Sequence, residues 1–163
     1  MNKRTVKCFA AFVVPALLAA AACEFEVEPE YPGGPGVHVE EIMRQAHATL
    51  VFDGRMWVLG GRTGTSQASE PFWFHNDVHW STDGLTWRLM TRHAQWGRRC
   101  SHAAAVFNGR MWVMGGTWVD GTLRQCYSND IWISSNGAEW TFVGLAPWSP
   151  RADHAAVVHK GRL

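Results

Sequence analysis

Short apolar stretches separated by turn residues recur along the last two-thirds of the chain. Residues 102–107 are largely apolar and run into Asn108-Gly109, a pair that favours a two-residue hairpin because both positions accept positive φ. A second β-forming stretch covers 110–116 and ends in two glycines. After a loop of about a dozen residues, 129–134 and 139–143 follow as further short stretches. The pattern predicts four antiparallel strands in a unit of about 50 residues.

The unit occurs more than once. Residues 52–61 (FDGRMWVLGG) return as 107–116 (FNGRMWVMGG), and Asn76-Asp77 returns as Asn129-Asp130. An Arg-x-x-His-Ala segment begins each copy, at Arg44, Arg99 and Arg151. The distance between copies changes only where loops would shorten, which is how structural repeats diverge.

The repeated unit resembles the kelch repeat, and the resemblance covers residues 44–163. The features that carry it are a strand ending in Gly-Gly, an Asn-Asp strand and a single Trp before the next Arg-x-x-His. The resemblance implies an all-β fold, a kelch-type β-propeller with four-stranded antiparallel blades. Trp57 and Trp112 stand where the family often has Tyr. The repeated structural positions are Gly60, Gly61, Gly115, Gly116, Trp87, Trp140, His47, His102 and His154. Bacterial envelope proteins with such repeats are similar, and galactose oxidase-like kelch propellers are wider relatives.

Residues 81–87 (STDGLTW) also resemble the Asp-box of sialidase-type propellers, with a weaker copy at 135–140. An Asp-box is a hairpin turn, so this resemblance implies a role in folding and not in catalysis.

The repeat count predicts an incomplete propeller. Two units reach Gly-Gly, and a third stops at Leu163, which gives about two and a half repeats. A closed propeller needs roughly four to eight blades. We therefore expect a partial or truncated chain; closure of a short chain by oligomerisation is the alternative.

Composition adds that the chain can bury a core, since 47% of its residues are hydrophobic and 18% are charged. The net charge is +1; without Lys3, Arg4 and Lys7, 12 basic residues face 14 acidic ones, about −2. This balance gives no electrostatic footprint for nucleic acid.

The first 23 residues are typical of an export signal: a basic start, an apolar run and four alanines before Cys23. Ala20-Ala21-Ala22-Cys23 resembles a bacterial lipobox, although Ala20 stands where Leu is usual. Ordinary signal-peptidase cleavage is the alternative. Residues 24–43, acidic and rich in Pro and Gly at their start, are interpreted as a tether. We expect an exported protein, in the cell envelope (outer membrane or periplasm) through a lipid anchor on Cys23, or otherwise secreted.

Few residues suggest chemistry. His47, His102 and His154 are of a type that binds zinc or copper, but equivalent positions in successive blades do not converge on one ion, so a structural role is favoured. The arginines beside them are expected to tie blade to blade. The glycine pairs lack a phosphate-loop continuation. We expect no catalytic residue, metal or cofactor in this segment. Cys100 and Cys126 are possible disulfide partners in an oxidising compartment, and the sequence leaves their pairing open.

Aromatic side chains gather in the long connections 62–75, 91–99, 117–128 and 144–151, which strand alternation places on one face of the propeller, termed here the long-loop face. Candidate ligand-binding residues there are Phe72, Trp73, His75, Trp96, Trp118 and Trp148. The alternative is that these rings pack between blades as core.

Two functions follow. The first is a non-catalytic binding module that recognises a protein or a carbohydrate through the long-loop face. The second is the N-terminal part of a carbohydrate-active kelch enzyme, galactose oxidase-like or sialic-acid mutarotase-like, with its active site in other blades. No residue present matches a galactose oxidase-like copper site.

Overall fold

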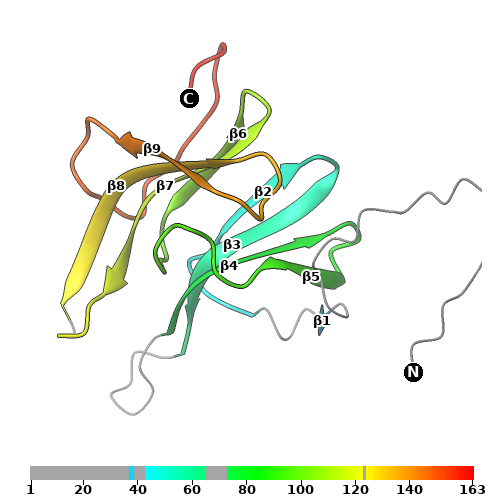
Figure 1. Ribbon diagram of the computed structural model, residues 1–163, viewed down its shortest axis with the longest axis horizontal. Coiled ribbons are helices and arrows are strands. Elements are labelled where there is room, and N and C mark those ends of the chain that lie inside the picture. The colour runs from blue at the N-terminus through cyan, green and yellow to red at the C-terminus, as the bar shows by residue number, and fades with distance from the viewer. Residues whose placement is uncertain (1–36, 39–42, 65–72, 123) are drawn as a thin grey trace, which may run out of the picture.

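The computed structural model describes residues 37–38, 43–64, 73–122 and 124–163. Within these ranges the chain forms strands and no helix (Figure 1), so none of the described residues belongs to a helix that could cross a membrane. The strands are β1 (Val37–His38), β2 (Ala48–Phe52), β3 (Arg55–Thr63), β4 (Trp73–Ser81), β5 (Thr86–Thr91), β6 (Ala103–Phe107), β7 (Arg110–Val119), β8 (Gln125–Ser134) and β9 (Thr141–Leu145). The predicted all-β class is confirmed.

The strands form two antiparallel sheets. Strands β2 to β5 make the first four-stranded unit, blade 1, and β6 to β9 make blade 2, with strand order following chain order in each. The short β1 pairs with the outer strand β5 of blade 1, so two residues of the segment interpreted as a tether lie on a sheet edge. The export signal with Cys23, and the rest of the tether up to residue 42, lie outside the described residues.

Tight hairpins join the first two strands of each unit, as predicted. In Asp53-Gly54 and in Asn108-Gly109 both residues have φ between 48° and 66°. The same conformation recurs at Lys160-Gly161, where His159 and Arg162 form an isolated bridge. The third unit, which begins at Arg151, therefore includes its first hairpin, which agrees with about two and a half repeats.

The middle strands are longer than predicted, and this moves several candidate residues from loops into strands. A bulge between Met114 and Gly116 interrupts the pairing of β7 with β8, and pairing then resumes as far as Val119. Blade 1 has the same irregularity at its glycine pair and continues to Trp73. The expected loops of a dozen residues are thus shorter, because the β-forming residues beyond the glycines extend the hairpin.

The Asp-box-like segment forms a self-contained turn. Asp83 Oδ1 accepts hydrogen bonds from the backbone N–H groups of Leu85 (2.8 Å) and Thr86 (2.7 Å). These bonds, that from Thr86 first, lower the pKa of Asp83 to about 2. In the second copy Asn136 Oδ1 accepts the equivalent two bonds at 3.0 Å. Because the uncharged amide of Asn136 accepts the same two bonds, the role of the Asp83 carboxylate is to stabilise the turn.

The core lies between the blades. Leu59 and Trp57 of blade 1 pack with Met111 and Val113 of blade 2 in one buried cluster. Trp57 is 1% exposed and is covered by the β8–β9 turn, where a Cβ on Gly137 would lie 2.3 Å from its ring. Each blade thus buries one face against its neighbour, as stacked repeats require.

Replacement of Gly137 tests this packing. Gly137 (φ +78°) and Gly109 (φ +66°) both have left-handed backbones, but only Gly137 has atoms within 4 Å of the added methyl position. Gly109→Ala should cost about 1 kcal/mol of backbone strain, and Gly137→Ala about 1–3 kcal/mol more through overpacking. Urea unfolding measures both, and equal losses for the two variants would contradict the contact.

Candidate functional site

One arginine joins the two blades. The Arg99 N–H donates to His75 O (3.0 Å), and its carbonyl accepts from the N–H of Gly61 (2.9 Å), both in blade 1. Its guanidinium reaches blade 2, where it donates to Gly115 O (2.8 Å) and pairs with both carboxylate oxygens of Asp130 (2.6 and 2.7 Å). The side chain is 4% exposed. The blade-to-blade role predicted for this arginine is therefore present in the structure.

The repeat copies show the same arrangement as far as each extends. Arg44 pairs with Asp77 and donates to Gly60 O (3.1 Å), the equivalents in blade 1. The main chain of Arg151 is bonded to blade 2, through Ser128 O and the N–H of Gly116. Its guanidinium bonds to Ser149 of its own loop.

The repeated histidines occupy the space that the glycine pairs leave. A Cβ on Gly60 would lie 3.1 Å from the Cε1 atom of His102, and a Cβ on Gly116 would lie 2.8 Å from the Cβ of His102. The imidazole is thus held between the glycine of one blade and that of the next. Both of its nitrogens are buried without a hydrogen-bond partner. Burial and the adjacent Arg99 charge lower the pKa of His102 to about 3, so the ring is neutral at neutral pH.

A structural role for these histidines follows from this packing. His154 is placed against Gly115 and His47 against Gly61 in the same way, each 2.8 Å from the added Cβ. Among the described residues no group of three or more His, Cys, Asp or Glu side chains is arranged to hold a metal ion.

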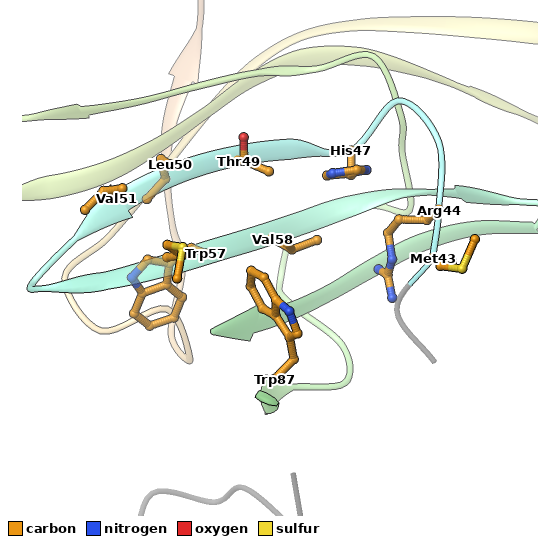
Figure 2. Close-up of a pocket in the computed structure, with 10 residues that line it drawn as sticks. Met43, Arg44, His47, Thr49, Leu50, Val51, Trp57, Val58 and Trp87 are labelled. Carbon is orange, nitrogen blue, oxygen red and sulfur yellow. The ribbon is translucent and has the colours of Figure 1, made fainter. Parts of the chain in front are cut away.

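An apolar hollow of about 590 Å³ opens on the side of blade 1 that faces away from blade 2 (Figure 2). Met56, Val58 and Trp87 are among the residues that line it. Their repeat equivalents Met111, Val113 and Trp140 are buried against blade 1. The hollow therefore has the chemistry of a blade-packing face, not of a ligand pocket.

Two further hollows lie on the long-loop face. On that face the β3–β4 and β7–β8 strand pairs point to the same side (Figure 1). The two hollows measure about 590 and 850 Å³ and share Trp73, Phe74 and Arg98, so together they form one groove, termed the inter-blade groove. Trp73, at the start of β4, is 62% exposed. Trp118, near the end of β7, lines the smaller hollow with it. The structure thus brings together, from different blades, two of the predicted rim tryptophans.

The other predicted rim residues divide between groove and core. His75 lines the larger hollow, and its Nε2 lies 3.0 Å from Thr63 Oγ1. Trp96 is fully buried and meets Trp140 edge to face at 5.9 Å, so its assignment to the rim is wrong and it belongs to the core. Trp148 is half-buried beside His154, at a ring distance of 5.4 Å. Phe72 lies outside the described residues.

Two groove residues escaped the sequence reasoning. Arg92 and Arg98 are exposed and line the larger hollow, and Arg98 also lines the smaller one. The available signal was the Arg98-Arg99 doublet, in which the repeat explains only the second arginine.

Cys100 and Cys126 are free thiols in the structure. Cys100 is buried, and burial raises its pKa. The disulfide that the sequence left open is not formed here.

The bonding of Arg99 to both blades is termed the clamp. The fold and the clamp together define a segment of a β-propeller, in which repeated Arg, His and Gly-Gly positions hold the blades together. The kelch motif family model matches residues 98–133. Kelch domain-containing protein 3 of cattle is 29% identical over 122 residues, and that of the rat is 31% identical over 104 residues. These alignments cover 72% and 62% of this chain. The chain therefore contains a kelch motif and is similar to kelch-repeat proteins.

A solved structure shows the same fold. The protein YjhT superposes with a TM-score of 0.50 at 19% identity, over 67% of this chain and 39% of that one. The chain spans 30% of the cattle relative and 25% of the rat relative. The comparisons therefore identify the repeat and its fold.

The buried imidazole of His102 predicts a loss of stability in acid. The pKa of His102 is about 3 in the folded chain, against 6.5 for an unperturbed histidine, so the unfolded chain binds the proton first as pH falls. The contribution of neutral His102 to the unfolding free energy is fully present above pH 6.5 and is lost as the pH falls toward 3. His102→Gln should flatten the pH dependence of the unfolding free energy by about 1–2 kcal/mol between pH 7 and 5. Urea unfolding at both pH values measures this, with exposed His159→Gln as control; an unchanged slope in His102→Gln would contradict the assignment.

Proposed function

We propose that this chain belongs to an exported kelch-repeat binding module that holds its ligand in the inter-blade groove. The observation that carries this is the joint presence of Trp73 and Trp118, from blades 1 and 2, at one hollow. Indole rings give large contact area at low conformational cost, which makes them efficient binding residues. A concave surface with aromatic walls and a few polar groups is the usual form of a ligand site.

Export is supported by the order of basic, apolar and small residues before Cys23, with lipidation of Cys23 as the proposed anchor. Residues 24–36 would then separate the propeller from the membrane, because Pro- and Gly-rich segments act as extended spacers.

Both a protein and a glycan are ligands of suitable chemistry. Kelch repeats generally mediate protein–protein interaction, which supports the first. The size of the smaller hollow, about 590 Å³, lies in the range of small-molecule sites and supports the second. We place the glycan first because the hollow has the volume of a small-molecule site and has tryptophans from two blades.

Binding to a glycan array tests the proposal. Trp73→Ala and Trp118→Ala should each weaken binding by about tenfold or more, since buried aromatic anchors contribute about 2 kcal/mol. Leu85→Ala serves as control, because Leu85 is 72% exposed at the opposite end of the β4 hairpin. Binding that survives both tryptophan substitutions would refute the groove as the site, and a protein ligand captured through the same tryptophans would place the protein class first.

A further inference from the structure

The described residues that line the inter-blade groove carry more positive than negative charge. They include the arginines Arg44, Arg92, Arg98 and Arg99 and the two aspartates Asp77 and Asp130. Each aspartate is already neutralised through both of its oxygens, Asp77 by Arg44 and Asp130 by Arg99. Among the described residues neither Arg92 nor Arg98 forms an ion pair with a carboxylate. Two exposed guanidinium groups therefore remain available to a ligand.

Two of the histidines that line the groove, His75 and His79, do not add to this charge. Burial is the main cause that lowers the pKa of His79, to about 4, and the Arg92 charge adds to it. The pKa of His75 is lowered by burial first and also by Arg44 and Arg98. Both imidazoles are neutral at neutral pH, so neither adds positive charge to that of the described arginines.

Arg98 is the better placed of the two arginines. It lines the smaller hollow together with Trp73 and Trp118, whereas Arg92 lines only the larger one. A guanidinium fork binds a carboxylate through two parallel hydrogen bonds. An exposed indole at the same hollow offers a flat apolar surface for a ring.

We propose that the inter-blade groove binds a carboxylated sugar of the uronic acid type. The Arg98 guanidinium pairs with the carboxylate, and Trp73 and Trp118 pack against the sugar rings. This inference rests on the proposed function. It adds that the glycan is negatively charged and that Arg98 is the residue that recognises the charge.

A matched pair of ligands tests the inference. A short oligogalacturonate and its fully methyl-esterified form have the same rings and differ in charge, and titration calorimetry measures both. The acid should bind about tenfold tighter than the ester, equivalent to about 1.4 kcal/mol, because a hydrogen bond to a charged group is stronger than one between neutral groups. The preference should shrink as salt is raised. Arg98→Gln should abolish it, while Arg110→Gln, at the opposite end of β7, should leave it intact.

The outcomes separate this inference from the proposed function. Equal binding of acid and ester, weakened in both cases by Trp73→Ala, would overturn the inference and leave glycan binding in place. A preference for the acid that persists in Arg98→Gln would also overturn it. Binding of an acidic peptide of matched charge, but of neither sugar, would show that the ligand class is wrong. Loss of all binding in the wild type would reject both proposals.

Discussion

The bonding of Arg99 to two blades at once is the interaction on which the rest of the structure depends. Its main chain continues the hydrogen bonding of blade 1, while its buried guanidinium is held by an aspartate and a carbonyl of blade 2. The glycine pairs follow from this constraint, because the main chain of Arg99 passes so close to Gly60 that a Cβ there would lie 3.1 Å from the Arg99 carbonyl. The histidine three residues later then fills the space between the glycines.

The same clamp positions the inter-blade groove. Trp73 comes from blade 1, Trp118 from blade 2, and Arg98 from the segment that precedes the clamp residue. The three side chains face one hollow only while the two blades keep their register. The groove is thus a property of the junction between the two blades.

Much of the fold could be predicted from the sequence because the same local motifs recur in each repeat. The Asn-Gly and Asp-Gly pairs fix tight hairpins through their backbone freedom, and the Arg-x-x-His spacing recurs in three copies. The groove was less predictable. Trp96 and Trp148 occupy equivalent positions, yet the first is buried because a complete blade covers it and the second is not. The continuation of β7 past its glycines depends on a partner strand, and the role of Arg98 depends on which carboxylates nearby are already paired.

A double-mutant cycle on Arg99 and Asp130 tests the clamp most directly. Arg99→Met and Asp130→Asn should each cost about 3–5 kcal/mol of unfolding free energy, since each leaves a buried polar partner uncompensated. The pair should show a coupling of about 1–3 kcal/mol. Arg151→Met, whose guanidinium bonds only to its own loop among the described residues, should change stability by about 0.5 kcal/mol or less. Additive effects at Arg99 and Asp130, or an equal loss at Arg151, would contradict the account.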